Sequence, residues 1–292
     1  MILAWVRVGL VAFFSSSFVI ATLAQEVNSV ATTDAAGESS HALDTATIRQ
    51  HRLNHFDAKL NTDVAQLRAQ CRYESEISTV APHKVLALTF DDGPEPVQTE
   101  YILSVLRQRH IKATFFMIGE QVKKYPELVA KVTAEGHHLV ANHSWDHPNF
   151  HSIGVTEQAL QVEKTGQELS GVMTQKLFRY PYGNATCETN DYLHKQGYKI
   201  VGWHIDSCDW AFEKTGGVDP KEAATCGVLP QFHSDYVGHV LSAIRAHNGG
   251  IVLMHEIHPN TLRKLGEIIE LALADGYSFD SIDALEFDRD MR

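Results

Sequence analysis

Two acidic side chains stand side by side directly after an apolar run. The segment LTFDDGP, residues 88–94, is apolar up to Phe90 and continues with Asp91, Asp92 and a Gly-Pro turn. Adjacent carboxylates repel each other and are costly to bury unless one of them is neutralised. A divalent cation can neutralise one carboxylate and leave the other to accept a proton from water. Taken alone, the segment is more simply a solvated turn, because Asp, Gly and Pro all favour turns.

A pair of histidines further along the chain could supply the other ligands of such a cation. The segment HSWDH places His143 and His147 four residues apart, so on a helical turn both side chains would lie on one face. Two imidazoles and one carboxylate leave coordination positions open for water and substrate, which is typical of catalytic metal sites. The chain contains 17 histidines, so this spacing also occurs without a metal.

Other polar residues repeat the pattern of a charged side chain at the end of an apolar run. They are Arg179, Asp206, Asp209 and His255. If the apolar runs are parallel strands of a (β/α) barrel, these positions all lie on one face, where catalytic loops converge. The sequence therefore predicts one site built from several strand ends.

From Val85 onward, short apolar runs alternate with helical patterns. The expected strands are 85–90, 113–118, 138–141, 177–179, 199–203 and 251–254. The expected helices are 97–109, 121–135, 155–170, 187–196, 234–247 and 260–274. Such alternation indicates parallel strands joined by right-handed crossovers. An irregular (β/α) barrel is the predicted α/β fold, and an open doubly wound sheet is the alternative.

Together these segments resemble the polysaccharide deacetylases of carbohydrate esterase family 4, also called the NodB-homology domain. Five signatures match in order: TFDDGP at 89–94, HSWDH at 143–147, RYPYG at 179–183, DSCDW at 206–210 and LMHE at 253–256. The resemblance implies the distorted (β/α) barrel of that family. The last signature departs from the family's usual His-Asp, because Glu256 follows the histidine, and no chemical role is assigned to this glutamate.

The resemblance also implies a metal centre with a base and an acid. Asp92, His143 and His147 would hold the ion, which is expected to be zinc or another divalent transition metal. Asp91 would be the general base, and His255 would be the general acid that protonates the leaving amine. Amide hydrolysis needs such an acid because the amine is a poor leaving group.

The resemblance also implies supporting roles for five further residues. Arg179 would pair with the base and hold it in place, and Asp209 would keep the acid charged and set its tautomer. Trp210 and Leu253 would wall a small pocket for the acetyl methyl group. The backbone N–H of Tyr182 would help to hold the oxyanion.

The implied activity is removal of N-acetyl groups, as acetate, from N-acetylglucosamine units of a peptidoglycan or chitin-type glycan outside the cytoplasm. An acetylxylan-type esterase and a non-catalytic glycan-binding homologue are the alternatives. The segment 211–230 is expected to form a loop over the site that could set chain-length preference. The net charge of −11 argues against nucleic acid as a partner, and a monomer is expected.

The N-terminal part reads as an export signal followed by a linker. Residues 1–24 combine Arg7 with an apolar stretch and small residues before Gln25, which predicts a signal peptide; an uncleaved anchor is the alternative. No second membrane span is expected. Residues 25–42 are expected to be a flexible linker, 43–80 a helical extension with a helix over about 45–70, and 81–292 the catalytic domain. The protein is therefore expected in the periplasm or outside the cell.

Four cysteines follow the predicted signal. An even number in an oxidising compartment permits two disulfides in three possible pairings. The preferred prediction pairs Cys208 with Cys226 and Cys71 with Cys187. A zinc-thiolate site is the alternative, although the chain has no C-x-x-C pair.

Overall fold

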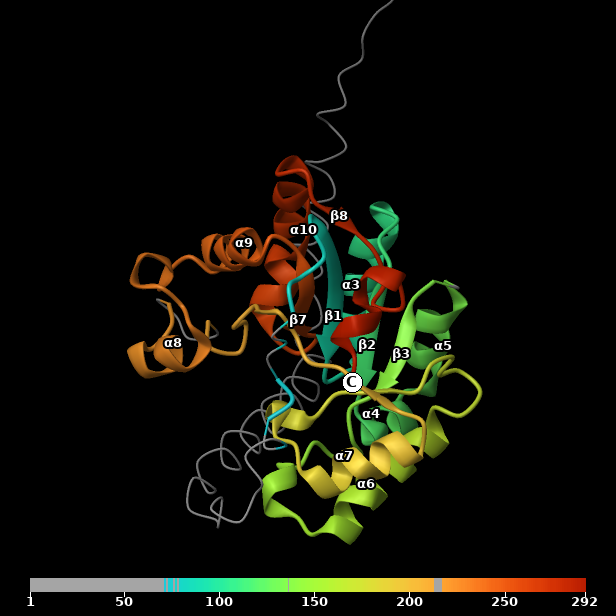
Figure 1. Ribbon diagram of the computed structural model, residues 1–292. Helices are drawn as coiled ribbons and strands as arrows, with labels where there is room; N and C mark the ends of the chain where they lie inside the picture. The colour runs from blue at the N-terminus through green and yellow to red at the C-terminus, as the bar shows by residue number, and fades with distance from the viewer. Residues whose placement is uncertain (1–70, 72, 76, 78, 136, 213–216) are drawn as a thin grey trace, which may run out of the picture. The chain divides into compact units, whose positions relative to one another are not determined.

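The computed structural model describes residues 71, 73–75, 77, 79–135, 137–212 and 217–292 (Figure 1). The predicted signal peptide, linker and helix over 45–70 lie outside these residues. The described residues all belong to one unit of the chain. Among the helices of these ranges, none combines the length and the apolar character needed to cross a membrane.

A parallel sheet forms the centre of the domain. Its strands are β1 (Val85–Asp91), β2 (Ala113–Met117), β3 (Leu139–Asn142), β4 (Leu177–Phe178), β5 (Lys199–Ile200), β6 (Ile205–Asp206), β7 (Gly250–His255) and β8 (Ser278–Phe279). Their order is β5-β4-β3-β2-β1-β7-β6, and β8 pairs with β1. The sheet curls into a half-barrel whose ladder does not close between β5 and β6 in the described chain. The predicted distorted (β/α) barrel is therefore confirmed.

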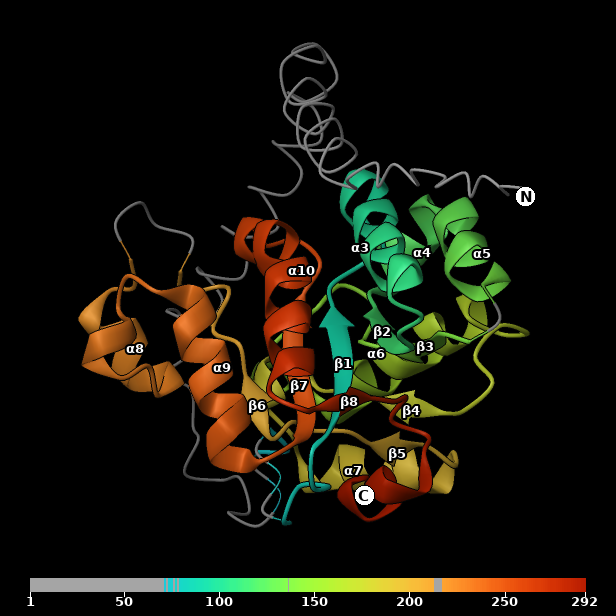
Figure 2. The ribbon, with the colours of Figure 1, turned by 90° about the horizontal axis from the view of Figure 1, so that it is seen from above.

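Helices connect the strands and cover the outer side of the sheet. They are α3 (Pro96–Gln108), α4 (Gly119–Lys124), α5 (Pro126–Ala134), α6 (Val155–Glu168), α7 (Cys187–Lys195), α8 (Pro220–Cys226), α9 (Tyr236–His247) and α10 (Pro259–Ala274). Seen from above, α3 and α10 lie beside β1 and β7 (Figure 2). Their apolar faces share one core with these strands, because every second side chain of β1 points toward them.

The alternation of side chains along β1 also determines which face of the sheet its polar side chains point to. Leu86, Leu88 and Phe90 enter the core under the helices, whereas Ala87 packs on the inner face of the half-barrel. Thr89 and Asp91 therefore project toward the inner face as well. The C-terminal segment fills the lower part of that interior with apolar side chains, so the polar groups gather at the carboxyl end of the sheet.

The structure departs from the predicted elements at three places. The helix expected over 121–135 is two helices, because Pro126 has no N–H to continue α4 and instead begins α5. The strand expected over 199–203 is shorter and forms only β5, and a separate strand that was not expected, β6, follows it. The loop expected over 211–230 contains α8, which Asp219 caps and Gly227 ends with φ 73°.

Candidate active site

Three predicted metal ligands meet at the carboxyl end of β1 and β3. The Nε2 atoms of His143 and His147 lie 3.5 Å and 3.4 Å from Asp92 Oδ1. All three side chains are buried, and one ligand atom from each lies within 4.8 Å of the others. Two imidazole nitrogens and one carboxylate oxygen fit zinc and similar divalent ions.

The HSWDH segment is a loop and not the expected helical turn. Ser144 and His147 have φ values of 67° and 59°, in the left-handed region, which bends the backbone out of a helical path. The amide oxygen of Gln161 accepts the backbone N–H groups of Trp145 and Asp146, at 2.8 and 3.1 Å. The two histidines still converge, but through a loop held by α6.

A backbone carbonyl sets the tautomer of one of these histidines. His143 Nδ1 lies 2.9 Å from the carbonyl oxygen of Arg179, which can only accept a hydrogen bond. Nδ1 therefore carries the proton, and the Nε2 lone pair faces Asp92. Burial lowers the pKa of His143, which also favours the neutral ring that a metal requires.

The predicted base is held by a fully buried arginine. Arg179 Nη1 donates to Asp91 Oδ1 at 2.8 Å and to Thr89 Oγ1 at 2.8 Å. Its Nε and Nη2 donate to the carbonyls of Val201 and Gly202, at 3.2 and 2.9 Å. These contacts fix the guanidinium in one orientation, so the carboxylate of Asp91 has a defined position.

The predicted acid is paired with a buried carboxylate on the other side of β1. His255 Nδ1 donates to Asp209 Oδ1 at 2.7 Å, and the His255 backbone N–H donates to Oδ2 at 2.7 Å. The hydroxyl of Thr261, in the first turn of α10, donates to the same Oδ2. Asp209 therefore has its charge satisfied, and it fixes the proton of His255 on Nδ1.

The pKa values of this pair move in opposite directions. Burial raises the pKa of Asp209, but the charge and hydrogen bond of His255 outweigh it and lower the value to about 2. Burial lowers the pKa of His255, but Asp209, with smaller contributions from Asp92 and Asp91, raises it to about 10. The pair is therefore an ion pair at neutral pH.

The register of the sheet places base and acid side by side. Asp91 of β1 is the parallel partner of His255 of β7. Asp91 and His255 therefore lie next to each other at the carboxyl edge of the sheet, and the metal ligand Asp92 follows Asp91 in the chain. Five strand ends or following loops contribute to this edge, as the sequence predicts.

The remaining predicted residues lie around this edge. Tyr182 has φ 58°, and its ring centroid is 4.7 Å from that of His147. Trp210 follows Asp209 and is partly buried, whereas Leu253 is buried in β7 two residues before His255. These positions agree with the expected arrangement, and the roles of the residues stay predictions.

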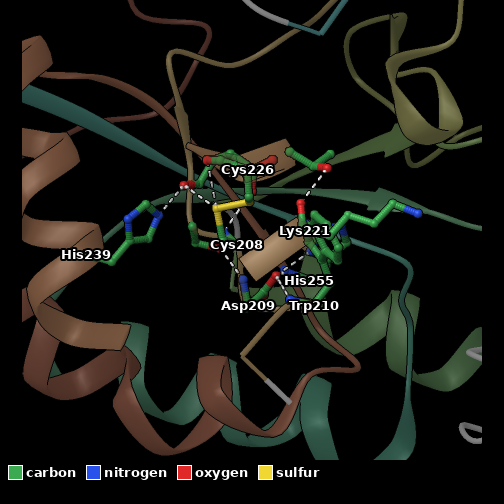
Figure 3. Close-up of a disulfide and its surroundings, with 10 residues drawn as sticks. Cys208, Asp209, Trp210, Lys221, Cys226, His239 and His255 are labelled. Atoms are coloured by element: carbon green, nitrogen blue, oxygen red, sulfur yellow. Dashed lines mark hydrogen bonds and ion pairs between the residues drawn. A yellow bond between two sulfur atoms is a disulfide. The ribbon is translucent and has the colours of Figure 1, made fainter. Parts of the chain in front are cut away.

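Both predicted disulfides are confirmed, and one of them borders the site. Cys71 pairs with Cys187, and Cys208 pairs with Cys226. Figure 3 shows the second disulfide beside Asp209, Trp210 and His255. It ties the loop that carries Asp209 to the end of α8.

Comparison with known proteins places the chain in a family. The family model for polysaccharide deacetylases matches residues 79–201. A peptidoglycan-N-acetylglucosamine deacetylase of Listeria monocytogenes is 32% identical over 213 residues, which are 72% of this chain and 40% of the relative. A peptidoglycan-N-acetylglucosamine deacetylase of Bacillus cereus is 33% identical over 204 residues, which are 68% of this chain and 69% of the relative.

The chain belongs to the polysaccharide deacetylase family, carbohydrate esterase family 4. A solved peptidoglycan N-acetylglucosamine deacetylase superposes with a TM-score of 0.59 at 28% identity, covering 73% of this chain and 92% of the other. A pseudoenzyme of the family from Bacillus anthracis superposes with a TM-score of 0.57 at 25% identity, covering 70% and 66%. The family thus includes both deacetylases and a member described as a pseudoenzyme.

In this family member, the glutamate after the acid supports the turn after β1. Glu256 is completely buried, and its backbone N–H donates to the Asp91 carbonyl at 2.9 Å. Thr99 of α3 donates its hydroxyl to the carboxyl group. Burial raises the pKa of Glu256 to about 8. A Cβ at Gly93 would lie 1.8 Å from Glu256 Oε1, so the turn rests directly on this carboxyl group.

The sequence alone does not identify the residues that support the site indirectly, by holding another residue in place. Three such groups lie outside the five signatures and are distant in sequence from the groups that they hold. They are the hydroxyls of Thr261 and Thr99 and the carbonyl of Gly202. Threonine at the first turn of a helix is common, and a backbone carbonyl has no sequence signal. Only Glu256 could have been found, because a glutamate beside the acid departs from the family pattern.

Proposed function

We propose that this polysaccharide deacetylase is a metal-dependent hydrolase that releases acetate from N-acetylglucosamine units of a glycan outside the cytoplasm. One observation carries the proposal. The buried cluster of Asp92, His143 and His147 lies beside an arginine-held Asp91, which is the strand partner of His255 in the ionised Asp209–His255 pair. Each chemical group that amide hydrolysis requires has a residue in a suitable position.

The donor set supports a divalent metal, with zinc as the proposed ion. Asp92, His143 and His147 would hold it, and the Arg179 carbonyl would orient His143 from behind. When bound, the ion would polarise the acetyl carbonyl and lower the pKa of a coordinated water.

The side chains around the metal residues would move the protons. Asp91 would accept a proton as water adds to the acetyl carbon, and Arg179 would keep its carboxylate in place. His255 would donate a proton to the nitrogen as the carbon–nitrogen bond breaks. Acetate and a glycan with a free amine are the products.

Two further groups would shape the acetyl subsite. The backbone N–H of Tyr182 would donate to the developing oxyanion, beside the ring of His147. Trp210, which follows Asp209 in the chain, and Leu253, two residues before His255 on β7, would border the methyl group.

Peptidoglycan is the first proposed substrate and a chitin-type glycan the second. The names of the Listeria and Bacillus cereus relatives support peptidoglycan, but the chain spans only 40% of the Listeria protein's length. Two disulfides agree with an oxidising compartment outside the cytoplasm. The catalytic domain is proposed to cover 81–292 and to act as a monomer.

Acetate release tests this function against the alternatives. The zinc-loaded protein is incubated with peptidoglycan, chitin oligomers and acetylxylan, and acetate is measured. We expect release from at least one N-acetylglucosamine glycan. Release from acetylxylan alone would favour the esterase, and no release from any glycan would favour a non-catalytic protein like the pseudoenzyme.

Substitutions at the base and acid test the assigned roles. Asp91→Asn and His255→Ala should each lower kcat by about 10²- to 10⁴-fold, because each removes a proton-transfer group. His194→Ala, on the exposed surface of α7, is the matched control and should leave kcat unchanged. Circular dichroism checks the fold. Turnover close to that of the unchanged protein in either variant would refute that role.

A further inference from the structure

A short N-terminal segment lies against the loops of the site. We call Cys71, Tyr73, Glu74, Ser75 and Ile77 the N-terminal strap. It comes before residue 79, where the match to the family model begins. It contributes no strand to the main sheet, yet its backbone pairs with two loops at the carboxyl side.

The first of these loops carries Tyr182. The Glu74 N–H donates to the Gly183 carbonyl at 2.9 Å, and Tyr73 forms an antiparallel bridge with Asn184. A Cβ at Gly183 would lie 2.5 Å from Ser75 Cβ, so the strap touches this loop without intervening atoms. The position of the proposed oxyanion donor therefore depends on the strap.

The second loop holds the arginine. The Trp203 N–H donates to the Ser75 carbonyl at 2.8 Å, and the Ile77 N–H donates to the Trp203 carbonyl at 2.9 Å. A Cβ at Gly202 would lie 2.4 Å from the Ser75 carbonyl oxygen. The carbonyl of Gly202 in turn accepts Nη2 of Arg179. The strap thus supports the residue that positions the base.

Covalent and polar contacts anchor the strap itself. Cys71 is bonded to Cys187 at the start of α7. The nearly buried carboxylate of Glu74 accepts Asn190 Nδ2 at 3.1 Å on one oxygen and Arg292 Nη1 at 2.9 Å on the other. Asn190 also accepts the hydroxyl of Tyr180, in the same loop as Tyr182.

We propose that the N-terminal strap is a positioning element for the deacetylase site, locked by the Cys71–Cys187 disulfide and by Glu74. The inference rests on the proposed function and deepens it. The strap holds the Tyr182 loop and the Gly202 carbonyl. The metal ligands are held from β1, β3 and α6, and the Arg179 carbonyl that contacts His143 is fixed by the backbone hydrogen bond of Arg179 to β3. Releasing the strap therefore impairs transition-state stabilisation and leaves metal binding intact.

Kinetics of strap variants of the full chain provide the first readout. In Glu74→Ala and in Cys71→Ser/Cys187→Ser, we expect kcat to fall by about 10- to 100-fold, because small displacements of catalytic groups have effects of this size. KM and zinc content should change little, whereas the melting temperature of the disulfide variant should fall, because a cross-link between residues 116 apart is lost. Glu74→Gln, which keeps one acceptor oxygen, should recover part of the loss. Asp288→Ala removes an exposed ion pair with Lys199 and should have no effect.

Amide hydrogen exchange provides a second readout that needs neither turnover nor metal. Peptides covering 180–184 and 201–203 should exchange faster in Glu74→Ala, while those covering β1 and β7 should not change. If the unchanged protein is active, turnover within two-fold of it in both variants, or zinc loss in proportion to kcat, overturns the inference. If the unchanged protein releases no acetate, the proposed function fails. In that case, unchanged amide hydrogen exchange of both loops in Glu74→Ala overturns the inference that the strap positions them.

Discussion

Asp209 and His255 show how single residues are tuned for the proposed chemistry. Because the folded pKa of His255 is raised from 6.5 to about 10, the pair stabilises the fold fully below pH 6.5, and this stabilisation is lost as pH rises through about 10. The pKa of Asp209 is lowered from 3.8 to about 2, so its contribution is present above pH 3.8 and is lost as pH falls through about 2. A proton donor is thus kept charged across the neutral range.

Replacing Asp209 by asparagine should change the pH dependence of activity. Without the carboxylate, burial of His255 is no longer offset, and its pKa should fall by about 2 units or more. The alkaline limb of kcat/KM should therefore move to lower pH, and kcat at pH 8 should fall. Thr261→Val removes one hydrogen bond to Asp209 but leaves the carboxylate in place, so it should move the alkaline limb little. An alkaline limb at the same pH in Asp209→Asn would contradict the proposed acid.

The turn between β1 and α3 is the element that carries base and metal ligand together. Two backbone hydrogen bonds connect it to β2 and the residue that follows β2. The Asp92 N–H donates to the Phe116 carbonyl, and the Ile118 N–H donates to the Gly93 carbonyl. Glu256 closes it from the other side. No side chain fits between Gly93 and Glu256, so the turn that precedes α3 packs directly against the residue that follows β7.

Gly93→Ala should destabilise the protein and weaken metal binding. The added methyl must displace Glu256 or the turn, and overpacking of this kind costs about 1–3 kcal/mol. The double variant Gly93→Ala/Glu256→Ala should cost less than the sum of its single changes, because the smaller side chain makes room. Gly154→Ala is the control, since a Cβ there meets no atom within 4 Å. Urea unfolding and zinc titration provide the measurements, and strictly additive effects would exclude the contact.

At the scale of the whole molecule, the metal residues join parts of the chain that are distant in sequence. Asp92 follows β1, and His143 and His147 follow β3, so one ion would link two strand ends. An ion that binds the folded state alone stabilises it by mass action.

Adding zinc should therefore raise the melting temperature of the metal-free protein. At a free zinc concentration of 100 times the dissociation constant, the ion should add about 2.7 kcal/mol to the free energy of unfolding. For a domain of this size, this raises the melting temperature by about 5–10 °C. His143→Ala removes one ligand and should show a much smaller shift. His194→Ala should behave like the unchanged protein. Equal melting temperatures with and without zinc in the unchanged protein would contradict the metal site.

Most long elements and the residue types of the site could be read from the amino-acid order. The apolar runs of β1 and β7 and the apolar period of the long helices are local properties, and the polar residues directly after such runs mark the strand ends. The five signatures then implied the family and the expected ligands. Local pattern was sufficient there because each signature lies within a few consecutive residues.

Other features depend on contacts between distant segments and carried no local signal. β6 and β8 stand outside the expected strands. They have two residues each, too few for a period, and they form because β7 and β1 pair with them. The left-handed residues Ser144 and His147 turned an expected helical turn into a loop. The strap and Thr261 act through hydrogen bonds across more than 40 residues of sequence, and such bonds form only when the folded chain brings both groups together.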